Sequence, residues 1–101
     1  MSRARITVPR ERVEEFCRQH HIRWLALFGS VLRDDFRPES DVDVLVEFEP
    51  DHRYTYFTLA RVEDDLSALL GRKVDLHVPG MLHSSLRDKV LSQAEDLYAG
   101  A

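Results

Sequence analysis

The chain has 101 residues, of which 44% are hydrophobic and 32% charged, a balance that predicts one folded domain over residues 1–101. The formal net charge of −4 argues against a general nucleic-acid binder, so we expect no direct binding to nucleic acid. Cys17 is the only cysteine, which excludes an internal disulfide and favours a cytoplasmic location. We expect neither a signal peptide nor a membrane span.

The first third of the chain predicts a helix followed by a buried strand. Apolar residues recur at helical spacing over residues 9–20, and Thr7 is the expected N-cap of this helix. The run IRWLALF at 22–28 is short and apolar, so it predicts a buried strand. Gly29 and Ser30 follow at once and predict a tight turn that leads into one helical turn.

The rest of the chain predicts two more strands and two more helices. Alternation at period two predicts a strand over 41–48, and VDLHV at 74–78 predicts a third strand. A helical stripe covers residues 55–70, with Gly71 at the expected C-cap. Ser85 is the expected cap of a last helix, whose apolar stripe is Leu86, Val90, Ala94 and Leu97. This order predicts an α/β (α+β) fold, a small mixed β-sheet flanked by helices.

Three aspartates carry the strongest chemical signal. Asp41 and Asp43 stand two residues apart on one predicted strand, so their side chains point the same way, and Asp75 lies on the next strand. Two carboxylates about 5 Å apart repel by roughly 3 kcal/mol at an intermediate dielectric, which a cation would relieve. Because Mg²⁺ prefers oxygen ligands, we expect the three aspartates to hold two Mg²⁺ ions for in-line nucleotidyl or phosphoryl transfer.

Gly29 and Ser30 predict the binding site for the phosphates of a nucleotide. Glycine lets the backbone approach a ligand closely, and a helical turn that begins at Ser30 would present N–H groups to an anion. Arg33, about one turn further on, could reach the same phosphates. A Gly-Ser turn and an Asp-x-Asp strand are each common without such a function, so the prediction depends on their combination.

At these residues the sequence resembles the DNA polymerase β-like nucleotidyltransferase superfamily. Within it, the chain is similar to the minimal nucleotidyltransferases, the antitoxins encoded beside HEPN-domain toxins. The matching segments are FGSVLR at 28–33, SDVDVLVEF at 40–48, GRKVDL at 71–76 and the tail at 86–98. The resemblance covers nearly the whole chain and implies the polymerase β-like fold.

The resemblance also implies a role for each residue of the set. Gly29 and Ser30 would hold the phosphates of the NTP, Asp41 and Asp43 would bind both metal ions, and Asp75 would complete the catalytic metal site. The implied reaction moves AMP from ATP to a hydroxyl, a tyrosine in the family, of a partner HEPN toxin. This modification would silence the RNase activity of the toxin.

The sequence departs from the family's pattern at two places. Family members often carry Gly directly after the Arg of the first motif, where this chain has Asp34 and then Asp35. Their negative charge could weaken NTP binding. His77 replaces a residue that is usually apolar and shares the predicted face of Asp75, so it stays open as a ligand, a catalytic residue or a structural histidine.

Other notable residues favour ordinary structural roles. The core is the expected place for Cys17, Trp24, Phe28, Tyr54, Tyr56 and Phe57. The last three could instead form an exposed patch for a partner. The acidic run at 63–65 is expected to be a solvated helix face.

Three functions stay open on the sequence alone. The first is Mg²⁺-dependent transfer of AMP from ATP to a partner toxin, because the three aspartates are present and the chain is too short for a deep acceptor site. The second is an antitoxin that neutralises its partner by binding without catalysis, for which the Asp34-Asp35 pair is the hint. The third, a small-molecule nucleotidyltransferase, would need a second domain.

Overall fold

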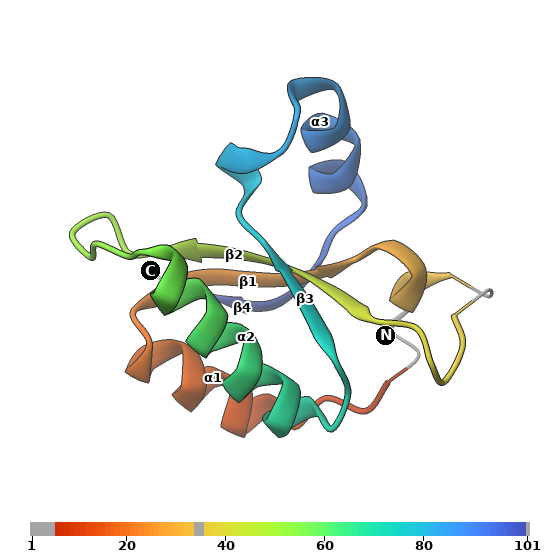
Figure 1. Ribbon diagram of the computed structural model, residues 1–101, viewed down its shortest axis with the longest axis horizontal. Helices are drawn as coiled ribbons and strands as arrows, with labels where there is room; N and C mark the ends of the chain where they lie inside the picture. The colour runs from red at the N-terminus through yellow and green to blue at the C-terminus, as the bar shows by residue number, and fades with distance from the viewer. Residues whose placement is uncertain (1–5, 34–35, 101) are drawn as a thin grey trace.

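Figure 1 shows the computed structural model, which describes residues 6–33 and 36–100. The elements in chain order are α1 (Arg10–Gln19), β1 (Ile22–Phe28), the 3₁₀ turn η1 (Gly29–Leu32), β2 (Val42–Phe48), α2 (Tyr56–Leu70), β3 (Val74–His77), the 3₁₀ turn η2 (Pro79–Met81), α3 (Ser84–Gln93) and β4 (Glu95–Ala99). No helix in this part of the chain is long and apolar enough to cross a membrane.

The strands form one mixed sheet, as the sequence predicts. Their order is β3-β2-β1-β4, and β1 is antiparallel to both of its neighbours. β2 and β3 are parallel, which requires a crossover connection, and α2 supplies it. The register places Phe28 of β1 opposite Asp43 of β2, and Asp43 opposite Asp75 of β3. Phe28, Asp43 and Asp75 therefore lie in one row across β1, β2 and β3.

Helices lie on both faces of the sheet (Figure 1). α1 and α2 pack on one face, where the main hydrophobic core includes Val44 and Leu66. α3 lies on the other side, where Leu45 and Val90 belong to a smaller cluster. Because side chains alternate along a strand, Asp43 points to the same face as Leu45. The aspartate row is thus on the face that α3 covers only in part.

Several helix ends agree with the sequence and others do not. Gly71 ends α2 in the left-handed conformation with φ +70°, which confirms the expected C-cap. Thr7 is not the cap of α1, because the helix begins at Arg10 and Pro9 takes the N-cap position without a side-chain hydrogen bond. Ser85 is not the cap of α3 either. The N-cap is His83, whose ring Nδ1 accepts a hydrogen bond from the Ser85 backbone N–H at 3.3 Å.

The end of the chain differs most from the prediction. The last helix was expected to carry Ala94 and Leu97, but α3 ends at Gln93 and residues 95–99 form the fourth strand. Leu97 is buried, with 4% of its surface exposed, as its place in the apolar stripe predicts. It is buried as part of the sheet and not of a helix. The strand forms because it pairs with β1, whose outer backbone groups would otherwise lack partners. This non-local pairing overrides the local helical pattern.

The aromatic residues divide between core and surface. Trp24 and Phe28 are half-buried against the smaller cluster, and Cys17 is fully buried. The expectation that the other three lie in the core is wrong, since the exposed fractions are 36% for Tyr54, 79% for Tyr56 and 88% for Phe57. The reason is that α2 buries its later turns against the sheet, through Val62, Leu66 and Leu70.

Candidate active site

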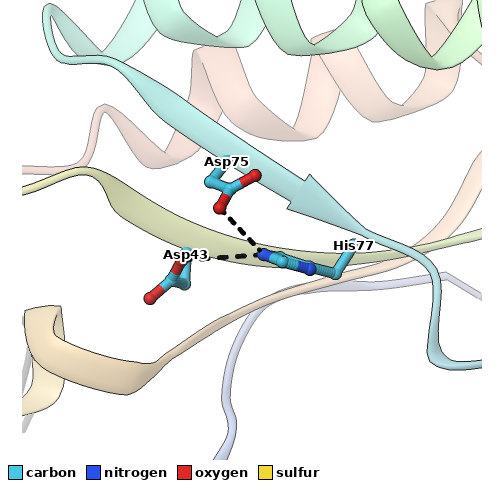
Figure 2. A group of neighbouring side chains, drawn as sticks. All are labelled: Asp43, Asp75 and His77. Carbon is cyan, nitrogen blue, oxygen red and sulfur yellow. Dashed lines mark ion pairs between the residues drawn. The ribbon is translucent and has the colours of Figure 1, made fainter. Parts of the chain in front are cut away.

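The parallel strands β2 and β3 bring two of the predicted aspartates together with a histidine. Asp43 and Asp75 face each other in register, and His77 follows Asp75 on the same side of β3. Figure 2 shows both carboxylates directed toward the ring of His77. His77 Nε2 lies 3.3 Å from Asp75 Oδ2 and 3.6 Å from Asp43 Oδ1. One ligand atom from each residue lies within 4.8 Å of the others, so the three could share one cation.

Gly29 contacts this group from the end of β1. Its φ of +76° is in the left-handed region that favours glycine. A Cβ at this position would lie 2.5 Å from Asp43 Oδ2, which is closer than real contacts allow. Glycine was expected here because it would let phosphates approach. The structure adds a second reason, since only glycine leaves room for the Asp43 carboxylate.

The structure places the other predicted site residues around this point. Asp41 is half-buried and directly precedes β2, but it is not one of the three described residues whose ligand atoms converge. Ser30 lies in η1, which confirms the expected helical turn, and its backbone carbonyl accepts a hydrogen bond from the N–H of Arg33 at 2.9 Å. Asp34 and Asp35 lie outside the described residues.

Two adjoining hollows lie beside Gly29. One has a volume of about 230 Å³ and is lined by Gly29, Leu32, Arg33 and Gln93. The other has a volume of about 210 Å³ and is lined by Phe28, Gly29, Arg33, Leu86, Lys89, Val90 and Gln93. Arg33, selected from the sequence, lines both hollows. Lys89 and Gln93 were not among the residues predicted from the sequence, although their helical spacing from Leu86 puts them beside the apolar stripe of α3.

The charge of His77 responds to its two acidic neighbours. The pKa of His77 is raised from the usual 6.5, chiefly because the Asp43 carboxylate stabilises the protonated ring. Burial acts in the opposite direction, and the negative charge of Asp75 adds to the increase. His77 was one open possibility in the sequence, and its signal was the alternation that it shares with Asp75. The structure places it inside the acidic group.

Comparisons with known proteins identify the family of this chain. Residues 10–97 match the model of the nucleotidyltransferase domain family. The protein adenylyltransferase MntA of Thermococcus cleftensis is 38% identical over 72 residues, which are 71% of each chain. A structure described as a minimal nucleotidyltransferase is 39% identical, with a TM-score of 0.70 and coverage of 85% of this chain and 86% of that chain.

A more distant structure supports the fold alone. It is a tri-AMPylated HEPN toxin of Shewanella oneidensis in complex with an MNT antitoxin, with 20% identity and a TM-score of 0.64. The match covers 89% of this chain and 69% of that chain. Together with the closer structure, it confirms the fold. The chain belongs to the nucleotidyltransferase domain family and, within it, to the minimal nucleotidyltransferases.

Proposed function

We propose that this chain transfers AMP from ATP to a hydroxyl, in the first instance a tyrosine, of a partner HEPN toxin, and that it acts as the antitoxin of that partner. The single observation that carries the chemistry is the pair Asp43 and Asp75, opposite each other on adjacent strands and next to Gly29. The names of the relatives support the transferred group and the kind of partner. The mixed donor set supports a divalent cation.

The residues present fit a Mg²⁺-dependent site. Two carboxylates face one point, and the side chain of Asp75 is half exposed, which leaves room for ligands from the substrate. A divalent ion bound there would favour ionisation of the acceptor hydroxyl and neutralise the charge of the leaving pyrophosphate. We assign metal binding to Asp43 and Asp75 and keep Asp41 and a second ion as predictions.

The nucleotide would occupy the hollows between η1 and α3. Gly29 belongs both to these hollows and to the contact with Asp43, so a phosphate bound beside it would also be close to the carboxylates. Arg33 and Lys89 line the same space and would offset the negative charge of a triphosphate. Ser30 would add a donor from the turn. The acceptor tyrosine would come from the partner protein.

The test uses the purified chain, its HEPN partner, Mg²⁺ and labelled ATP. Wild-type protein and Asp51→Asn, a control in an exposed turn, should label the partner and silence it. Asp43→Asn and Asp75→Asn should abolish labelling. If the partner is silenced by all four proteins without any label, the chain is an antitoxin that acts by binding. If the chain modifies only a small molecule, the protein acceptor is wrong.

A further inference from the structure

The ring of His77 lies where a cation shared by Asp43 and Asp75 would need a third ligand. Its Nε2 is the atom nearest to both carboxylates, at 3.3 and 3.6 Å (Figure 2). The alternation of β3 directs residues 75 and 77 to the same side, so the arrangement follows from the backbone and does not depend on a loop. Two oxygens and one nitrogen therefore converge from two paired strands.

The nitrogen of His77 lies at ion-pair distance from both carboxylates and is bonded to neither. Nε2 is buried, and it makes no hydrogen bond of acceptable geometry with any described residue. The ring also packs against Phe28, edge-on at 5.1 Å between centroids. Its nearest polar neighbours are therefore one oxygen of each carboxylate, and no other described group binds this nitrogen. A metal ion bound among these three atoms would take Nε2 and one oxygen of each carboxylate as its ligands.

We propose that His77 is a metal ligand, so that this site binds a divalent ion through two carboxylates and one imidazole nitrogen. The inference deepens the proposed function and rests on its divalent-ion requirement. Imidazole nitrogen favours first-row transition ions over Mg²⁺, which prefers oxygen and keeps its water ligands. The site therefore binds Mn²⁺ or Co²⁺ in preference to Mg²⁺, and this preference is stronger than that of a site made of carboxylates alone.

The decisive measurement detects the nitrogen directly. Mn²⁺ is added to the purified chain with a non-hydrolysable ATP analogue, and electron spin-echo spectroscopy records modulation from a coordinated ¹⁴N. The variants are His77→Gln, which keeps a polar side chain without the imidazole, and His77→Val. The control is His20→Gln. His20 also lies near a carboxylate, 3.8 Å from Asp65, but it is the C-cap of α1 and does not belong to the site on β2 and β3. Circular dichroism verifies that each variant is folded.

We expect ¹⁴N modulation in wild type and His20→Gln, and none in either His77 variant. In calorimetry, both His77 variants should bind Mn²⁺ or Co²⁺ about 10-fold to 100-fold more weakly, with a much smaller change for Mg²⁺. Modulation that is absent from Mn²⁺-loaded wild type, or an unchanged Mn²⁺ to Mg²⁺ preference in the variants, overturns the inference.

A second measurement distinguishes failure of this inference from failure of the proposed function. Labelling of the HEPN partner is recorded with Mg²⁺ for wild type and His77→Gln. If labelling occurs but the nitrogen signal is absent from wild type, the transferase stands and His77 is not a ligand. If wild type binds no divalent ion in the presence of the nucleotide analogue, both the inference and the metal-dependent function are wrong.

Discussion

Replacing Gly29 with alanine should damage the active site more than the fold, and Gly71 offers a matched control. Both glycines are left-handed, with φ +76° and +70°, so an alanine at either place costs about 1–2 kcal/mol of backbone strain. For a domain of this size that corresponds to a fall in melting temperature of roughly 5–15 °C. The two sites differ in their neighbours, because a Cβ at residue 71 meets nothing within 4 Å.

At residue 29 the added methyl group would displace the Asp43 carboxylate. The contact would have to open from 2.5 Å to the ordinary 3.4 Å, a difference of 0.9 Å. A misplacement of about 1 Å in a reacting geometry can reduce the rate about 100-fold. We therefore expect Gly29→Ala to lower the rate of AMP transfer by about that factor, and Gly71→Ala to leave the rate within about 3-fold of wild type.

The assay combines thermal denaturation with initial rates of partner labelling at saturating ATP. Both variants are measured below their melting temperatures, so that differences in rate do not reflect unfolding. Equal rates for Gly29→Ala and wild type, at equal folded fraction, would show that the Asp43 carboxylate does not depend on the space beside Gly29. Equal losses in the two variants would show that general strain causes the effect.

Three further predictions follow from single contacts. Burial raises the pKa of the Cys17 thiol to about 12, so iodoacetamide at pH 8 should modify native protein far more slowly than protein unfolded in guanidinium. Lys89→Glu should weaken binding of an ATP analogue about 10-fold or more. Arg12→Glu, which makes the same charge change on α1, should have little effect. Equal Kd values for the two variants would contradict the assignment of the hollow beside Lys89 to the nucleotide. Trp24 Nε1 donates to Asp96 Oδ1 at 2.7 Å, so Trp24→Phe should lower stability by about 1 kcal/mol in chemical denaturation, and an unchanged midpoint would refute this.

Local patterns in the sequence were sufficient for most of the fold. The apolar run, followed at once by Gly29 and Ser30, predicts the strand at 22–28 with its observed bounds. The strand at 95–99 was missed because its residues, EDLYA, are mostly polar and form a strand only by pairing with β1. A strand that depends on a distant partner has no strong local signal. The length of the segment and the period of its apolar residues therefore do not reveal this strand.

The candidate site was predicted in part for the same reason. Spacing along strands was enough to select Asp43 and Asp75, which the register then places opposite each other. The neighbouring position of Gly29 needed the three-dimensional turn, and the contribution of Lys89 depends on how α3 lies over the sheet. Asp41 shows the limit of the pattern. It stands two positions before Asp43, as the pattern requires, but β2 begins only after it.

The acidic helix face at 63–65 has a role that its sequence conceals. β3 carries Asp75 and His77 and is an edge strand, so one row of its N–H groups has no neighbouring strand. α2 provides acceptors for two of them. Val74 N–H donates to Ser67 Oγ at 2.9 Å, and Leu76 N–H donates to Glu63 Oε2 at 2.9 Å. The expectation of a solvated face is therefore wrong for Glu63.

These two hydrogen bonds should hold β3, which carries Asp75 and His77, in place. Glu63→Ala removes a charged acceptor from a partly buried N–H, and the loss should be about 1–3 kcal/mol. Asp64→Ala, its exposed neighbour, should change stability by less than about 0.5 kcal/mol. Hydrogen exchange should accelerate at the Leu76 amide in the first variant only, with weaker binding of divalent ions because Asp75 and His77 lie on either side of that residue. If the Leu76 amide keeps its protection in Glu63→Ala, α2 does not hold β3 in place, and the pairing with β2 alone sets the geometry of the site.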